Sequence, residues 1–156
     1  MDIEQVRQEV AGRLQSAVTE IQGSMAANGI NASGRTSASV RVRMTEKGVQ
    51  LVAGGGDAAP FATVEVGRAG GKIPAGFTDI LEQWTRDKGL QFETDSKRRS
   101  FAYLLGQKIK REGTARHRQP VDVYSGIAKV AAEDVKRIVT EGVSKVVVGD
   151  IVHDFK

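Results

Sequence analysis

The chain has 156 residues, of which 40% are hydrophobic, 27% charged and 5% aromatic, and none is cysteine. These values are ordinary for a soluble protein with a single domain over residues 1–156, and they exclude a disulfide scaffold and thiolate chemistry. The formal net charge of +4 is unevenly distributed, since residues 97–118 carry eight Lys or Arg and one Glu, a net +7, which leaves −3 for the remainder.

Residues 2 to about 27 are predicted to form a long amphipathic helix, because apolar residues recur at steps of three and four. These residues are Ile3, Val6, Val10, Leu14, Ala17, Val18, Ile21 and Met25. Asn28-Gly29 marks its end, since both residues tolerate left-handed backbone. We expect a core helix of a single domain, with a free coiled coil as the alternative.

Residues 39 to 54 are predicted to form a β-hairpin with a short turn that contains Gly48. Apolar residues alternate with others on both sides of this turn: Val40, Val42 and Met44 before it, and Val49, Leu51 and Ala53 after it. The alternation directs this set toward the core and points Arg41 and Arg43 to solvent or to a neighbour.

The segment after residue 60 is less regular. Residues 61–66 are compatible with a strand or with a short helical turn. Gly67-Arg68-Ala69-Gly70-Gly71-Lys72 superficially resembles a phosphate-binding loop, but three residues instead of four separate its outer glycines, and Ile73 replaces the required hydroxyl. We therefore expect an exposed basic loop, pinned by Pro74, that presents Arg68 and Lys72.

Two shorter helices are predicted next. In the first, four apolar residues form one stripe, which places Trp84 in the core: Phe77, Ile80, Leu81 and Trp84. The second runs from about Ser96 to Glu112, and its apolar side consists of Phe101, Leu104, Leu105 and Ile109. Its opposite side is a cationic, hydrogen-bonding stripe of Arg99, Tyr103, Gln107 and Lys110, which is either solvated or an interface with an acidic surface of another subunit.

A basic loop with Arg116 and Arg118 follows, and His117 has no partner at metal-ligand spacing, so no metal site is expected. A third long helix begins near Tyr124, and the Val-rich residues 143–152 either continue it or form a terminal strand. The predicted fold class is α+β. It is a small antiparallel sheet flanked by long N-terminal and C-terminal helices and by the two shorter helices.

An ordered series of short motifs covers roughly residues 25–115. It consists of Asn31-Ala32-Ser33-Gly34-Arg35-Thr36, Pro60-Phe61-Ala62, Glu65-x-Gly67-Arg68, Gly71-Lys72-Ile73-Pro74, Ile80-x-x-x-Trp84-x-x-x-Lys88-Gly89, Phe101-Ala102 and Lys108-Ile109-x-x-x-Gly113-Thr114. In this order the motifs resemble small virion proteins of tailed bacteriophages, the head–tail connector or tail-completion family. That family tends to continue with a Pro-Phe-hydrophobic segment, whereas this chain has Gln119-Pro120-Val121-Asp122, which leaves the place of the C-terminal third in the assembly open.

The resemblance implies a structural virion protein with no catalytic residues and no cofactor. It implies a homo-oligomeric ring of six or twelve copies at the neck, assembled in the host cytoplasm, that joins portal to tail and lines or seals the DNA passage. The expected partners are a portal or adaptor protein, tail proteins and, transiently, packaged DNA. No apolar run approaches the roughly 20 residues of a membrane-spanning helix, and the polar, acidic N-terminus is unlike a secretion signal, so no membrane contact is expected.

The charge pattern independently suits a contact between the basic face of one copy and the acidic N-terminal helix of the next. The candidate subunit-interface or DNA-facing residues are Arg41, Arg43, Arg68, Lys72, Arg99, Tyr103, Lys110, Arg116 and Arg118. The alternative is a nucleic-acid-binding module that uses the basic residues 97–118, although Tyr103 is its main aromatic platform and no known DNA-binding signature is present. An enzyme is not expected, because no motif brings Ser, His and Asp together.

Overall fold

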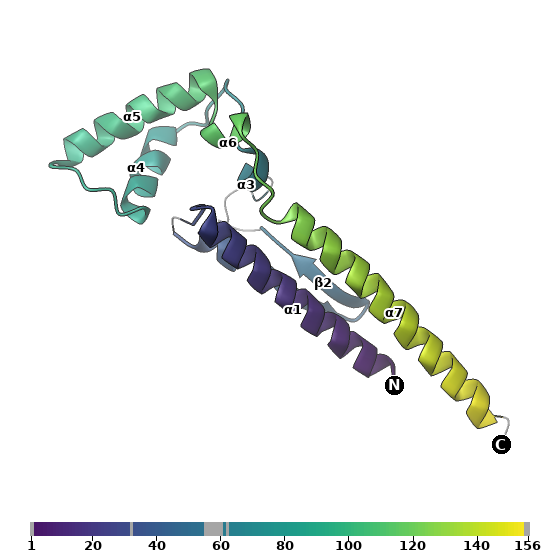
Figure 1. Ribbon diagram of the computed structural model, residues 1–156. Coiled ribbons are helices and arrows are strands. Elements are labelled where there is room, and N and C mark those ends of the chain that lie inside the picture. The colour runs from purple at the N-terminus through teal and green to yellow at the C-terminus, as the bar shows by residue number, and fades with distance from the viewer. Residues whose placement is uncertain (1, 32, 55–60, 62, 155–156) are drawn as a thin grey trace.

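The structure is a computed structural model that describes residues 2–31, 33–54, 61 and 63–154. Figure 1 shows a long rod, formed by two helices and a hairpin, with a smaller pair of helices beyond one end of it. We call this second part, residues 67–118, the arm. The combination of helices with one antiparallel hairpin confirms the predicted α+β class with long terminal helices.

The rod is built on α1 (Ile3–Ala27) and α7 (Ser125–Asp154), which run antiparallel and side by side (Figure 1). Their register is visible in two contacts. A Cβ on Gly142 would lie 2.5 Å from Cγ2 of Val6, and Nε of Arg13 donates to Oδ2 of Asp134 at 2.8 Å. The prediction of two long helices is therefore confirmed, and residues 143–152 continue α7 instead of forming a strand.

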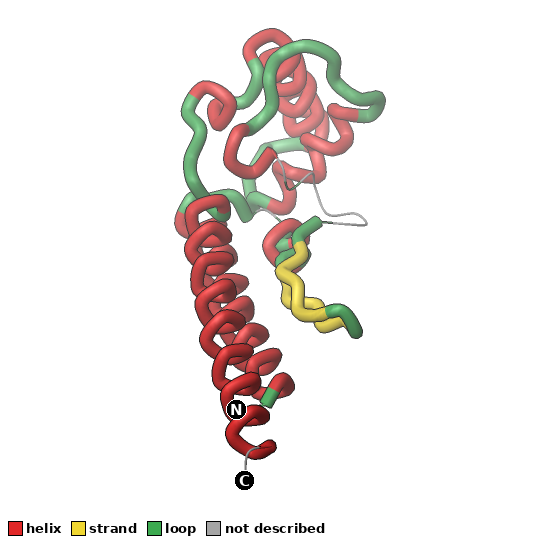
Figure 2. The backbone as a smooth tube through the Cα atoms, turned by 90° about the vertical axis from the view of Figure 1, so that its right-hand side faces the viewer, coloured by secondary structure: helices red, strands yellow, loops and turns green. Residues whose placement is uncertain are grey.

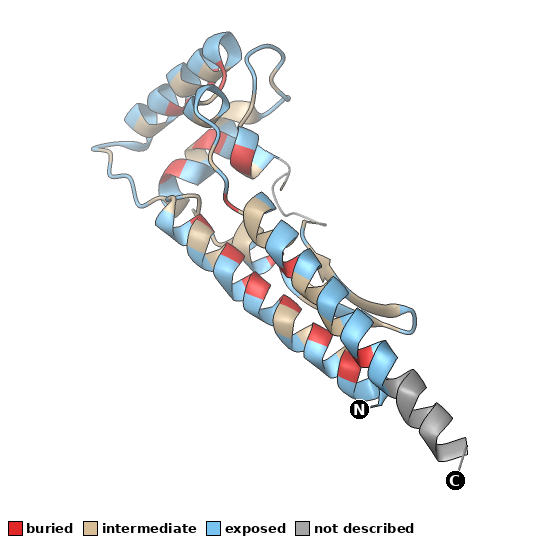
Figure 3. Cartoon of the chain, turned by 45° about the vertical axis from the view of Figure 1, so that its right-hand side comes forward, coloured by how far each residue is buried: buried red, intermediate tan, exposed pale blue. Residues whose placement is uncertain are grey.

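The buried residues of α1 form the stripe that the sequence predicts, from Val6 to Met25 (Figure 3). At the start of the helix, Oδ1 of Asp2 accepts from the backbone N–H of Gln5, and the Gln5 side chain accepts from the N–H of Asp2, which is a capping box. Stripe and cap together explain why this segment is helical from its third residue onward.

The hairpin consists of β1 (Arg41–Thr45) and β2 (Gly48–Val52), paired from Arg41 opposite Val52 to Thr45 opposite Gly48. It lies on one side of the two long helices (Figure 2), so its apolar side chains complete two small core clusters with them. Val42, Val49 and Leu51 pack against these clusters as predicted. Met44 was expected to point inward, but it is exposed, although Val49, its partner across the hairpin, packs against the core.

The short helix α2 (Arg35–Ala38) connects α1 to the hairpin, and the short helix α3 (Thr63–Val66) lies in the connection from the hairpin to the arm. Residues 63–66 are therefore helical, which decides between the two possibilities that periodicity left open. The arm consists of α4 (Phe77–Asp87), α5 (Asp95–Glu112) and the short α6 (Ala115–Arg118). In the part of the chain that the structure describes, no helix is long and apolar enough to cross a membrane.

Within the arm, α4 packs on a face of α5 that contains the buried residues Ala102 and Gly106. A Cβ on Gly106 would lie 3.4 Å from Cδ1 of Leu81, so the two helices approach closely at this glycine. The apolar side predicted for α5 is therefore mostly uncovered. Phe101 is 40% exposed and Leu104 is 65% exposed. Those two expectations of burial are wrong, because the small residues Ala102 and Gly106 are the buried residues on the α5 side of the contact.

The arm is tied to the rod by polar contacts. Nζ of Lys88 donates to the carbonyl oxygens of Gly29 at 2.5 Å and Asn31 at 2.9 Å, just beyond the end of α1. Nη2 of Arg116 lies 3.4 Å from the carbonyl oxygen of Asn28. These contacts join the arm to the backbone that follows α1, which fixes the arm at this end of the rod.

Candidate functional site

The nine predicted interface residues fall into two groups. Arg41 and Arg43 lie on β1 of the rod with exposed side chains, and Nη2 of Arg43 donates to Oε1 of Gln50 across the hairpin at 2.8 Å. The other seven belong to the arm: Arg68, Lys72, Arg99, Tyr103, Lys110, Arg116 and Arg118. The arm therefore holds most of the predicted site and is the candidate functional region.

Acidic residues that lie outside the basic sequence window pair with the first half of α5. Nη1 of Arg99 lies 3.0 Å from Oδ1 of Asp79 and 3.2 Å from Oε2 of Glu82, both on α4. Two more pairs involve the residues that precede Arg99: Lys97 with Glu93, and Arg98 with Asp95. The positive charges of residues 97–99 are therefore paired with carboxylates of the arm itself.

The second half of α5 retains more of its charge. Lys108 and Lys110 are exposed, and neither makes an ion pair within the described residues. Arg111 and Arg118 share the single acid Glu112, at 2.6 Å and 4.0 Å respectively. The available positive charge is thus concentrated where α5 ends, beside the loop that leads to α6.

An apolar groove of about 550 Å³ opens at this place, between α4, the second half of α5 and α6. Its floor is made of the apolar side chains of Phe77, Leu81, Trp84, Leu105 and Ile109. Three cations also line it, Arg68, Lys108 and Arg118, and the guanidinium of Arg68 lies 5.6 Å from the centre of the Phe77 ring. Trp84 was expected in the core, but it is 37% exposed, because it forms part of this open floor.

The loop that carries Arg68 is held against the end of α5. The N–H of Gly71 donates to the carbonyl oxygen of Lys110 at 2.6 Å, and the N–H of Thr114 donates to that of Arg68 at 2.9 Å. Gly67 is needed here, since its φ is +64° and a Cβ would lie 2.4 Å from the backbone nitrogen of His117. The sequence predicted an exposed basic loop. Arg68 is instead half-buried, and Lys72 is exposed.

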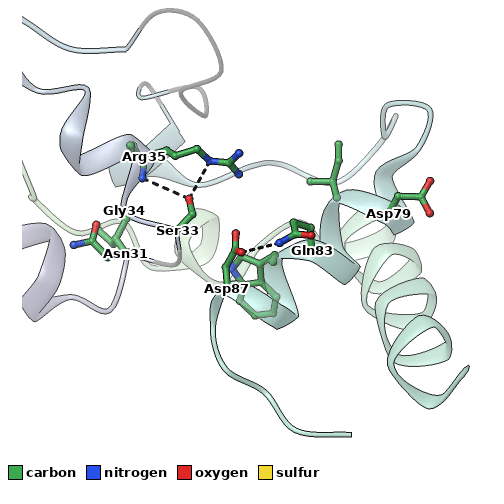
Figure 4. Close-up of a pocket in the computed structure, with 11 residues that line it drawn as sticks. Asn31, Ser33, Gly34, Arg35, Asp79, Gln83 and Asp87 are labelled. Atoms are coloured by element: carbon green, nitrogen blue, oxygen red, sulfur yellow. Dashed lines mark hydrogen bonds between the residues drawn. The ribbon is translucent and has the colours of Figure 1, made fainter. Parts of the chain in front are cut away.

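Two further cavities separate the arm from the rod. The larger, of about 670 Å³, is lined by residues that include Arg68, Lys88 and Arg116. The smaller, of about 480 Å³, lies between the loop around Ser33 and one side of α4 (Figure 4). In it, Nε of Arg35 donates to Oγ of Ser33 at 3.1 Å, and Nε2 of Gln83 donates to Oδ1 of Asp87 at 2.8 Å. Each of these hydrogen bonds joins two residues on the same side of the cavity, so neither bond crosses it.

A buried carboxylate joins the arm's connection to the rod. Oε1 of Glu65 accepts from the backbone N–H groups of Val123 at 2.9 Å, Tyr124 at 2.6 Å and Ser125 at 2.7 Å, at the start of α7. Burial alone would raise the pKa of Glu65. The hydrogen bond from the Ser125 hydroxyl and those from the three N–H groups outweigh it and lower the pKa to about 2. Glu65 is therefore a charged cap on α7.

The sequence reasoning missed three features of this region. Glu65 appeared only as one letter of a motif, and its partners lie about sixty residues away in the chain. Lys108 was counted in the basic window but was not chosen as a site residue, although it lines the groove. No feature of the sequence predicted that Leu104 is exposed, because apolar periodicity does not indicate whether the same chain or another molecule covers an apolar face.

Comparisons of the chain with models of known families, with curated proteins and with solved structures find no match. The function therefore has to be argued from the residues themselves.

Proposed function

We propose that this chain is a structural virion protein that assembles into a closed homo-oligomeric ring in the neck of a tailed bacteriophage. In this role it is part of the head–tail connector or tail-completion ring, joins portal to tail, and lines or seals the DNA passage. The ordered motifs between residues 25 and 115 support the phage assignment. The large exposed surface of a single copy supports the ring.

The observation that carries the ring proposal is the amount of surface that a single copy leaves uncovered. The chain exposes 10255 Å², whereas a monomeric protein of 16.8 kDa exposes about 7,700 Å². The excess is about 2,500 Å². Each subunit of a ring has two neighbours, and a standard interface covers about 800 Å² on each partner. The excess is thus large enough for both contacts of a ring subunit.

The character of the exposed surface points the same way. One side of α5 exposes Phe101 and Leu104, which are three residues apart, and Tyr103, half of whose surface contacts solvent, lies on the cationic side of the helix. Exposed apolar patches on a small protein are typical of surfaces that bind another protein. Aromatic residues and Arg are also enriched at the centres of protein interfaces, and the arm supplies both.

The proposal includes the expected partners and place of assembly. Six or twelve copies would form the ring in the host cytoplasm and remain in the virion, between a portal or adaptor protein and the tail proteins. No catalytic step, cofactor or membrane takes part in it. Packaged DNA would pass through the ring and contact its basic residues only transiently.

The first experiment measures the oligomeric state. The purified protein is studied by light scattering and by negative-stain imaging over about 1 µM to 1 mM, a range that covers weak and moderate dissociation constants. We expect rings of one copy number, alone or after addition of a phage portal ring. A chain that stays monomeric throughout this range, with and without a portal, would refute the proposal.

The second candidate is a nucleic-acid-binding module. It is favoured by Lys108 and Lys110, which are exposed and make no ion pair within the described residues, and disfavoured by the pairing of Arg99 with Asp79 and Glu82. Phosphate contacts release counterions, so such binding would weaken steeply with salt. A titration of duplex DNA at two salt concentrations separates the candidates, since tight, salt-sensitive binding by a monomer supports this second one.

A further inference from the structure

The arm and the far end of the rod carry opposite charges. Residues 67–118 contain twelve Lys or Arg and six Asp or Glu, a net charge of +6, which leaves −2 for the rest of the chain. At the far end of the rod, the first turns of α1 contain Asp2, Glu4 and Glu9 against one cation, Arg7. We call residues 2–9 the foot. Opposite net charges on two separate surfaces favour their association between copies.

The foot also carries an uncovered apolar side chain. Ile3 continues the stripe of α1 one turn beyond Val6, the first buried residue of that stripe, but Ile3 itself is 62% exposed. It is flanked by the acidic residues Asp2 and Glu4. An exposed Ile between two carboxylates has the opposite character to the groove of the arm, which has an apolar floor and three cations along its walls.

The two surfaces cannot meet within one molecule. Figure 1 places the N-terminus at one end of the rod and the arm at the other end, and α1 alone, with 25 residues, is about 37 Å long. A contact between foot and groove must therefore join two copies. Each copy has one groove and one foot, so contacts that repeat head to tail always leave one of each open and build a ring, whereas two copies that fill each other's groove close as a dimer.

We infer that the groove between α4, α5 and α6 binds the foot of a second copy of this chain. Ile3 of one copy lies on the floor formed by Trp84, Leu105 and Ile109 of the next, and Glu4 and Glu9 face Lys108 and Arg118. This inference rests on the proposed ring and specifies its subunit contact. In every interface, one copy supplies the groove and the next copy supplies the N-terminal turns that bind in it.

The test reverses one charge on each side. The variants are Lys108→Glu in the groove and Glu4→Lys in the foot, and their controls are Lys129→Glu and Glu133→Lys, two exposed positions on α7. Sedimentation measures self-association. We expect each groove or foot variant to weaken it by at least about tenfold, and the controls to leave it unchanged. A chain with both reversals, or a mixture of the two variants, should regain association because the charges match again.

A cross-linking experiment adds a geometric readout. The chain has no cysteine, so introduced thiols are the only ones present. Mild oxidation of Ile3→Cys/Lys108→Cys should give a ladder of covalent multimers on a denaturing gel. Each single variant should give dimers at most, and the control Ile3→Cys/Lys129→Cys should give no ladder.

The outcomes separate the two proposals. Wild-type rings that persist in both charge variants, or a charge-matched double variant that stays dissociated, overturn the foot–groove contact and leave the ring proposal standing. A wild-type protein that never self-associates overturns both. Binding of an acidic peptide in the groove of a wild-type ring, without loss of the ring, also overturns the contact, because the groove would then be free.

Discussion

Glu65 and Ser125 are joined by a hydrogen bond between the Ser125 hydroxyl and Oε2 of Glu65, at 2.5 Å, across sixty residues of sequence. The other carboxylate oxygen accepts three backbone N–H groups at the start of α7. One side chain of α3 therefore accepts from the backbone N–H groups that lead into a long helix, and its negative charge lies at the positive end of the helix dipole. This bond fixes the path of the chain from the arm back to the rod.

Replacing Glu65 with Gln should destabilise the protein strongly. The amide removes the charge, and because only one of its two terminal atoms is an acceptor, it cannot accept from both the three backbone N–H groups and the Ser125 hydroxyl as the carboxylate does. Charge-assisted hydrogen bonds contribute about 1.5–3 kcal/mol each and are not additive, so we expect a loss of about 2–4 kcal/mol in the free energy of unfolding. Urea denaturation followed by circular dichroism measures it. The exposed control Glu133→Gln on α7 should change stability by less than about 0.5 kcal/mol.

The same carboxylate should make stability depend on pH in the acid range. Its pKa is about 2 in the folded protein against an ordinary value of 4.5. Between these values the unfolded chain binds more protons, so stability rises with pH. The contribution is complete above about pH 5 and is lost as the pH falls through 4.5 toward 2. Urea midpoints of wild type and Glu65→Gln should approach each other as the pH falls from 5 and should converge only near pH 2, and curves that stay parallel would contradict this assignment.

Gly67 offers a matched pair with Gly29, because both have φ of +64°. A Cβ at residue 67 would lie 2.4 Å from the backbone nitrogen of His117, whereas nothing lies within 4 Å of one at residue 29. Gly29→Ala should cost only the backbone strain, about 1 kcal/mol. Gly67→Ala adds a clash with backbone and should cost at least about 1–3 kcal/mol more. Equal thermal shifts for the two variants would show that the loop relaxes freely.

Much of the rod could be predicted from the sequence, because its determinants are local. The apolar steps from Val6 to Met25 define the buried side of α1, and the alternation around Val42 defines the hairpin. Both patterns repeat within a few residues, and each has one large partner surface in the same chain. Local periodicity then agrees with tertiary packing, which is why these predictions are confirmed.

The arm could be predicted only in part, because its contacts are not local. A helix from about Ser96 to Glu112 was expected, but its packing face is set by Gly106, a residue with no hydrophobic signal. Leu104 belongs to an apolar side that no described residue of this chain covers well. For the candidate site, the acids Asp79 and Glu82 that pair with Arg99 lie twenty and seventeen residues earlier in the chain, respectively. The net charge of a sequence segment such as residues 97–118 therefore overestimates how much positive charge is free to bind a partner.

Two helical glycines should respond to alanine in opposite ways, since alanine is favoured over glycine in a helix by about 1 kcal/mol. At Gly106 the added methyl would meet Cδ1 of Leu81 at 3.4 Å, the flexible end of a side chain, so Gly106→Ala should be neutral or stabilise by up to about 1 kcal/mol. At Gly142 it would lie 2.5 Å from Cγ2 of Val6, inside the contact between α1 and α7, so Gly142→Ala should destabilise by about 1–2 kcal/mol.

Whether Gly142→Ala stabilises or destabilises the protein depends on one neighbour, Val6. A double-mutant cycle measures this dependence. In a Val6→Ala background the clashing methyl groups are absent, and Gly142→Ala should then stabilise the protein by up to about 1 kcal/mol through helix propensity alone. Urea denaturation of the four proteins gives the coupling energy, which we expect to be about 1–3 kcal/mol in favour of the double variant. Additive effects would mean that α1 and α7 are not held together at this pair of residues.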